Sequence, residues 1–188
     1  HWDLPSVFGK NGGWKNRDTT KWFADYTEII MKNFSDRLYS LATINEPWCV
    51  AWLSHYLGEH APGEKSPEAG VITMHMVLVA HAQALQVIRG YNFKNAGIVL
   101  NKQYVSPFDR TKECLAYTNL SNEIHNLWFD EAIFKGRYPK KSLELFDQYM
   151  PLGYENDLAM ISKPIDWVGI NYYTRSLIKK DKTEPFLG

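Results

Sequence analysis

The sequence has few cysteines, no excess of either charge, and no internal repeat or low-complexity segment. Lysine plus arginine and aspartate plus glutamate both number 21, so the net charge is zero and no basic run offers a surface for nucleic acid. No apolar run approaches the ~20 residues of a membrane-spanning helix. We therefore expect neither a nucleic acid nor a membrane as a partner, and a single domain over residues 1–188.

The two cysteines, Cys49 and Cys114, are far apart in sequence and do not form a CxxC pair. Two such thiols in a chain of this length are more often free than bridged. We expect both to be free, in a reducing compartment, and so predict a cytoplasmic protein.

The sequence also lacks the spacings typical of metal and phosphate sites. His75 and His81 are six residues apart rather than the four that place two ligands on one helical face, so they are interpreted as core histidines. The segment 9–13 is rich in glycine but does not have the register of a phosphate-binding loop. We therefore expect no metal and no cofactor.

What the sequence does contain is an alternation of helical and strand patterns, at 45% hydrophobic and 14% aromatic content. The alternation predicts an α/β fold with a parallel sheet covered by helices. The expected helices are 18–34, 66–90, 109–134 and 140–149, and Asp18 or Thr19 is the expected cap of the first. The expected strands are 38–44, 96–100 and 165–170. A long loop is expected after Glu46.

Glu46 stands where the first of these strands ends. Pro47 cannot continue a strand ladder, so the apolar run over 38–44 stops at Asn45-Glu46. Barrel enzymes keep catalytic residues at the carboxyl ends of their strands. The alternative is that Glu46 is an ordinary solvated loop carboxylate, and the other motifs of the chain argue against it.

Five motifs occur in a fixed order along the chain. They are His1-Trp2-Asp3-Leu4-Pro5, Gly12-Gly13-Trp14-Lys15-Asn16-Arg17, Asn45-Glu46-Pro47-Trp48-Cys49, His60-Ala61-Pro62-Gly63 and Asp166-Trp167-Val168-Gly169-Ile170-Asn171-Tyr172-Tyr173-Thr174-Arg175. In this order the set closely resembles glycoside hydrolase family 1, the β-glucosidase family. Trp128-Phe129 and Gly136-Arg137-Tyr138-Pro139 extend the resemblance along the whole chain.

The resemblance implies that the chain is part of a (β/α)8 TIM barrel. Three strands cannot close a barrel that requires eight. Compared with the family, the chain runs roughly from the exit of strand 3 to just after strand 6, so strands 1, 2, 7 and 8 are not in this sequence. We therefore expect a partial barrel domain that requires the remainder of the barrel.

The resemblance also implies a retaining β-glycoside hydrolase with Glu46 as the general acid/base. The family's nucleophile is a glutamate in a Thr-Glu-Asn-Gly motif, which this sequence lacks. The family pattern also implies substrate-binding roles for five residues, of which His1 would donate to a sugar hydroxyl, Trp2 would form a wall of the pocket and Asn45 would bind the 2-hydroxyl. Asn171 would orient the acid/base region and Tyr173 would donate to the nucleophile.

The function that fits best is a β-glucosidase that releases terminal β-D-glucose from glucosides or oligosaccharides. Three alternatives stay open: a non-catalytic carbohydrate-binding or interaction module derived from the same barrel, a 6-phospho-β-glucosidase and a β-galactosidase. The second carboxylate would discriminate the module from the enzymes, because double displacement requires two carboxyl groups.

Overall fold

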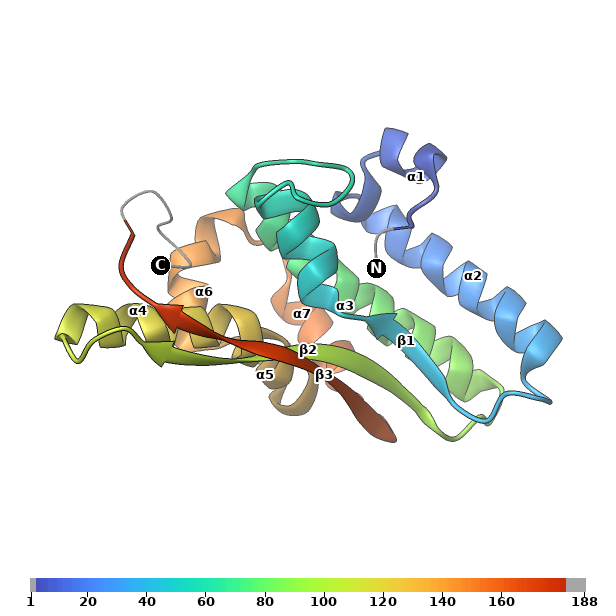
Figure 1. The fold of residues 1–188 in the computed structure, drawn as a ribbon. Coiled ribbons are helices and arrows are strands. Elements are labelled where there is room, and N and C mark those ends of the chain that lie inside the picture. The colour runs from blue at the N-terminus through green and yellow to red at the C-terminus, as the bar shows by residue number, and fades with distance from the viewer. Residues whose placement is uncertain (1–2, 182–188) are drawn as a thin grey trace.

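The structure, a computed structural model, describes residues 3–181. Its centre is a sheet of three parallel strands in the order β1-β2-β3, formed by Leu41–Asn45, Ala96–Pro107 and Trp167–Ile178. Figure 1 shows the two longer strands side by side, with β1 shorter at one edge and the helices packed around the sheet. The carboxyl ends of the three strands lie toward one end of the sheet because the strands are parallel.

The strands β2 and β3 are longer than the sequence predicts. They pair from Gly97 with Trp167 to Pro107 with Ile178, with a register shift between Lys102 and Tyr104. The predictions ended at 100 and 170 because the apolar run of each strand ends there. That run is largely buried in β2, whereas Val168 and Ile170 of β3 are exposed. The second halves are polar and are held by backbone hydrogen bonds to each other, which apolar periodicity does not detect.

Two long helices, α2 (Arg17–Phe34) and α3 (Pro67–Gly90), lie side by side behind β1 (Figure 1). Ser66 caps α3 as predicted, accepting a hydrogen bond from the Ala69 N–H. The predicted cap of α2 was wrong: Asn16 accepts from the Asp18 N–H, and the helix begins one residue before Asp18.

By length and composition α3 could cross a membrane, so the expectation that no apolar run approaches this length was wrong. However, 78% of its apolar window is buried inside the protein. It is the central helix of the core, which explains why it is apolar on nearly every side.

The loop expected after Glu46 was also wrong. The chain instead forms a buried π-helix, η2 (Cys49–Tyr56), whose apolar side chains pack on α3. The helix expected over 109–134 begins later, at Lys112, with Thr111 as its N-cap. It consists of three consecutive elements: α4 (Lys112–Asn122), the π-helical turn η3 (Glu123–Leu127) and α5 (Trp128–Lys135). It ends at Gly136 in a left-handed conformation, φ 61°.

Short helices complete the described residues. The segment predicted over 140–149 divides into α6 (Lys140–Phe146) and the 3-10 turn η4 (Asp147–Tyr149). The sequence analysis missed α1 (Ser6–Lys10), the 3-10 turn η1 (Gly13–Lys15) and α7 (Glu155–Ile161), each too short to show helical periodicity.

The two histidines of α3 are buried, in agreement with their interpretation as core residues. His75 lies between the Tyr138 hydroxyl, 2.7 Å from Nδ1, and Asp157, 3.0 Å from Nε2. His81 Nδ1 lies 2.6 Å from the Thr43 hydroxyl, which joins α3 to β1. Both cysteines are free and buried, which confirms the prediction on pairing.

Candidate active site

Glu46 directly follows β1 and is buried, with 5% of its surface exposed. Its N–H donates to the Val99 carbonyl at 2.8 Å, so its backbone is still tied to β2. Its φ is 52°, in the left-handed region that a residue with a side chain rarely adopts. Such a conformation persists only where the surroundings fix it, and it is concentrated at functional sites. The turn aims the carboxylate across the end of the sheet.

The carboxylate is held by groups from two other elements. Asn171 Nδ2 on β3 donates to Oε1 at 2.7 Å, and the Tyr173 hydroxyl lies 3.5 Å from the same oxygen. The Cys49 thiol, in the first turn of η2, donates to Oε2 at 3.3 Å. The structure thus brings both Asn171 and Tyr173 to Glu46. The sequence analysis expected Asn171 in the acid/base region but directed the Tyr173 hydroxyl to the nucleophile, so the contact of Tyr173 with Glu46 was not predicted.

Asn45 completes this group of predicted residues. Asn171 Nδ2 also lies 3.4 Å from its Oδ1, so the two asparagines lie together beside the carboxylate. Asn45 is exposed and Tyr173 is 78% exposed, so both are accessible to a ligand. His1 and Trp2, the other two predicted sugar-binding residues, lie outside the described residues.

The sequence analysis missed two features of the site. The first is Cys49, which lies one turn after Glu46 but fell in the segment taken as a loop. Burial raises the pKa of this thiol to about 12, helped by the hydrogen bond to Glu46 and the negative charge there. At neutral pH the thiol is therefore protonated and available as a donor.

The second is a pair of tilted rings that includes Trp48, two residues after Glu46 in sequence. The rings of Trp48 and His125, the latter on η3, have their centroids 4.3 Å apart. Burial, with a smaller contribution from the charge of Lys102, lowers the pKa of His125 to about 4, so this ring is neutral at pH 7. The indole N–H of Trp48 is buried without a hydrogen-bond partner among residues 3–181. Only the position of Trp48, two residues after Glu46, could have indicated this pair from sequence.

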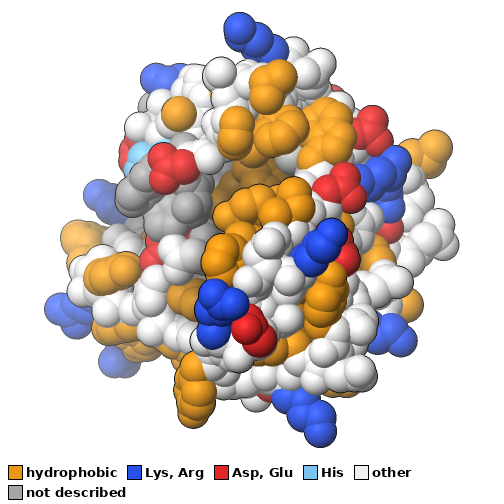
Figure 2. All heavy atoms as spheres, turned by 90° about the vertical axis from the view of Figure 1, so that its right-hand side faces the viewer, with side chains coloured by type: hydrophobic (Ala, Val, Ile, Leu, Met, Phe, Trp, Pro, Cys, Tyr) orange, Lys and Arg blue, Asp and Glu red, His pale blue; other side chains and the backbone are white. Residues whose placement is uncertain are grey.

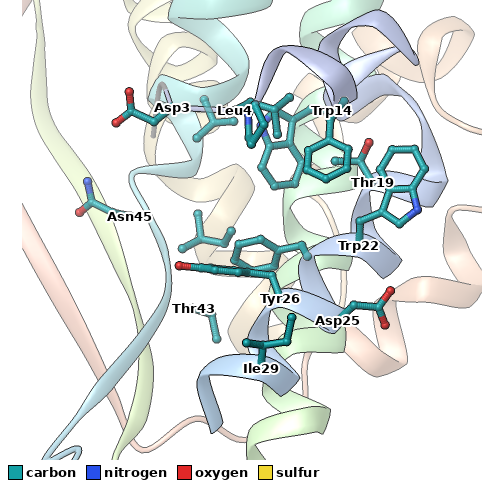
Figure 3. Close-up of a pocket in the computed structure, with 15 residues that line it drawn as sticks. Asp3, Leu4, Trp14, Thr19, Trp22, Asp25, Tyr26, Ile29, Thr43 and Asn45 are labelled. Atoms are coloured by element: carbon teal, nitrogen blue, oxygen red, sulfur yellow. The ribbon is translucent and has the colours of Figure 1, made fainter. Parts of the chain in front are cut away.

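A cavity lies beside β1, and Glu46 is not among the residues that line it. It has a volume of about 750 Å³ and lies between α1, α2 and β1. Figure 3 shows Tyr26 and Ile29 of α2 on the side of that helix toward Thr43 of β1, whereas Asn45 points to the other side of the strand. Figure 2 shows the same side of the molecule, with hydrophobic side chains around a hollow. Within the described residues β1 pairs only with β2, so this apolar cavity follows a free sheet edge.

No group of three or more His, Cys, Asp or Glu side chains suited to a metal ion occurs between residues 3 and 181. The chemistry that the described site offers is that of a buried carboxyl group. A carboxyl group fixed by an amide, a phenol and a thiol can hold or release a proton at a defined position.

The model of glycosyl hydrolase family 1 matches residues 1–186. The chain belongs to this family. Among curated proteins it is 38% identical over 187 residues to a 1,4-beta-D-glucan glucohydrolase of Thermotoga neapolitana, covering 98% of this chain and 44% of that protein. It is 39% identical over 184 residues to the beta-glucosidase of an Agrobacterium species, covering 97% of this chain and 40% of that protein.

Solved family 1 structures match the whole chain. The β-glucosidase of Thermotoga maritima superposes with a TM-score of 0.93 at 37% identity, covering 100% of this chain and 43% of that one. The family 1 β-glucosidase of Exiguobacterium antarcticum gives 0.91 at 35% identity, covering 100% and 43%. Family 1 β-glucosidases are TIM barrels, so the predicted fold class is confirmed: the chain forms part of a (β/α)8 barrel and spans less than half the length of these relatives.

Proposed function

We propose that this chain is the central part of a retaining β-glycoside hydrolase of the β-glucosidase type, with Glu46 as the general acid/base. The observation that carries the proposal is the buried Glu46 carboxylate at the end of β1, with Asn171 Nδ2 at 2.7 Å. Relatives 37% to 39% identical that bear the name β-glucosidase support the same class.

In this proposal the acid and base roles alternate on one residue. Protonated Glu46 donates its proton to the glycosidic oxygen while a second carboxylate attacks the anomeric carbon. The ionised Glu46 then removes a proton from water, which displaces the sugar from that carboxylate and restores the β configuration. Asn171 limits the rotation of the Glu46 side chain, which keeps the proton on the side of the leaving oxygen.

The other predicted residues take up the sugar. Asn45, exposed beside the carboxylate, binds the 2-hydroxyl, an interaction that strengthens in an oxocarbenium-like transition state. Tyr173 directs its hydroxyl to the nucleophile. His1 and Trp2 lie outside the described residues, and the roles that the family pattern implies for them stay predictions: a hydrogen bond from His1 to a sugar hydroxyl and a pocket wall from Trp2.

The remainder of the barrel supplies the second carboxylate and covers the apolar cavity beside β1. A free edge of a parallel sheet with an uncovered apolar side is unusual, because parallel sheets are normally covered on both faces. The described carboxylate has the position of one member of a catalytic pair, and the sequence holds no Thr-Glu-Asn-Gly motif for the other.

The test uses the full-length protein, meaning this chain together with the remaining family 1 segments. With an aryl β-D-glucoside as substrate, we expect turnover and β-glucose as the first-formed anomer. Proton NMR identifies the anomer if the spectrum is recorded before mutarotation mixes the two forms. Parallel assays with the β-galactoside and with the 6-phosphorylated glucoside compare the sugars that the sequence leaves open. First-formed α-glucose, or binding of glucosides without any turnover, would contradict the proposal; the second result would favour the non-catalytic module.

A further inference from the structure

Each oxygen of the Glu46 carboxylate is bonded to a different part of the fold. Oε1 accepts from Asn171 and Tyr173 on β3, whereas Oε2 accepts from the Cys49 thiol on η2 at 3.3 Å. Asn171 alone would leave the carboxyl plane free to rotate about its hydrogen bond. The second contact, on the other oxygen, fixes that rotation.

Cys49 is built rigidly into its place. It is 7% exposed, and its carbonyl accepts from the Ser54 hydroxyl at 3.3 Å within η2. The first turn of η2 is joined to the same glutamate through the backbone, because the Val50 N–H donates to the Glu46 carbonyl at 3.2 Å. These two hydrogen bonds hold the backbone of Cys49 close to that of Glu46.

The groups that face Glu46 come from four elements. Asn171 and Tyr173 face it from β3, Asn45 precedes it on β1, Cys49 lies on η2, and His125 of η3 lies behind Trp48. His125 is neutral at pH 7, and the Cys49 thiol is protonated there. The donors bonded to the Glu46 carboxylate are thus an amide, a hydroxyl and a thiol, and none of them is a cationic group.

We propose that Cys49 is a positioning residue for Glu46, whose thiol fixes Oε2 and stabilises the ionised carboxylate that acts as base in the second half of the reaction. The proposal rests on the proposed function of Glu46. A donor to the ionised form lowers the pKa of a carboxyl group, so removing the donor raises it. The Cys49→Val variant retains the volume and loses the donor, whereas Cys49→Ser retains a donor.

The first test is the pH dependence of kcat/KM of the full-length protein on an unactivated β-glucoside, whose alkaline limb reports loss of the acid proton from Glu46. We expect Cys49→Val to move this limb up by about 0.5 pH units, the scale of one neutral hydrogen bond. Cys49→Ser should leave it near its original position. The matched control is Cys114→Val, which removes a buried thiol bonded at 3.0 Å to the Ile178 carbonyl instead. An alkaline limb that is the same in Cys49→Val and Cys114→Val would overturn the proposal.

The second test does not depend on turnover. In the full-length protein, the rates at which iodoacetamide alkylates Cys49 and Cys114 are followed by mass spectrometry, before and after Glu46→Gln. If the thiol and the carboxylate are in contact, neutralising Glu46 removes a charge that disfavours the thiolate, and Cys49 reacts at least several-fold faster while Cys114 does not change. An unchanged ratio of the two rates would refute the contact, even in a fully active enzyme. If the ratio of the two alkylation rates changes but the parent full-length protein has no glycosidase turnover, the contact is supported and the proposed function is overturned.

Discussion

Asn171 donates to Glu46 across 2.7 Å although the two residues are 125 positions apart in sequence. The contact joins the residue after the end of β1 to Asn171 within β3, and β2 lies between these two strands in the sheet. It is therefore a property of the parallel sheet and not of either segment. Because an amide nitrogen is only a donor, the contact also favours the ionised form of Glu46 at Oε1.

We expect Asn171→Ala to lower kcat/KM of the full-length protein by about 10- to 100-fold, because a hydrogen bond to a charged group contributes roughly 1.5 to 3 kcal/mol. Steady-state kinetics on a β-glucoside measures the loss. Asn33→Ala is the control, since Asn33 is exposed on α2 and donates to the Ile29 carbonyl of its own helix at 2.8 Å. Equal activity of the two variants would show that Asn171 does not support Glu46.

Glu46→Gln separates the two proposed roles of the carboxyl group. The variant should form the glycosyl-enzyme from substrates with good leaving groups, which need little protonation, and should then stall because no base activates water. Added azide should restore turnover and give a β-glycosyl azide, identified by mass spectrometry and NMR. Glu144→Gln on the exposed face of α6 is the control. Unchanged hydrolysis of unactivated disaccharides, or no azide product, would remove Glu46 from the acid/base role.

The 188 residues expressed alone should show no glycosidase turnover, because a general acid without its partner carboxylate cannot complete double displacement.

The 188 residues expressed alone should also self-associate through the apolar cavity and the free edge of β1. Sedimentation velocity measures this. Ile29→Lys, in the cavity, should weaken the association, and Leu152→Lys, fully exposed outside it, should not. A monomeric chain with a cooperative thermal transition would contradict the expectation.

Acid should destabilise the fold through His81. Burial lowers its pKa from 6.5 to about 4, so below pH 6.5 the unfolded chain binds a proton that the folded chain does not. Stability is thus fully present above pH 6.5 and falls as the pH drops toward 4. For this one group the loss between pH 7 and pH 5 is about 2 kcal/mol. Urea unfolding of the full-length protein at both pH values checks this, and His81→Gln should show a smaller difference between them than the parent protein.

Gly97 lies where β2 passes closest to Trp167 of β3. A Cβ added there would stand 2.2 Å from the Trp167 carbonyl oxygen, so we expect Gly97→Ala to cost about 3 kcal/mol or more in unfolding free energy. Gly90→Ala, at the end of α3 with nothing within 4 Å of its added Cβ, should instead leave stability unchanged or raise it by up to about 1 kcal/mol. Urea denaturation compares the two variants. Similar urea midpoints for the two variants would contradict this expectation and show that β2 and β3 can move apart at Gly97 at little cost in stability.

The sequence was sufficient to place Glu46 at the end of a strand and to predict the order of the long helices and the three strands, because Asn45-Glu46-Pro47 follows an apolar run and Pro47 must end a strand. The acid/base role of Glu46 rests on the family resemblance and stays a prediction. It did not predict the second halves of β2 and β3, since their polar residues are held by pairing with another strand. Cys49 was missed for a related reason: η2 contains no strong helix periodicity, and its π-helical turns form only because its apolar side chains pack on α3. Local patterns thus located the carboxylate, whereas the contacts that orient it depend on the tertiary fold.

Under the proposed function, the left-handed backbone of Glu46 would place catalysis and folding in competition at a single residue. Glycine adopts a φ of 52° without steric cost and would relax this turn, but it has no carboxyl group. A search for thermostable variants would therefore select replacements of Glu46 among its best solutions, and each of them would lack the acid/base. Stability screens of this protein should hold position 46 fixed, because there the most stable sequence and the active one are different sequences.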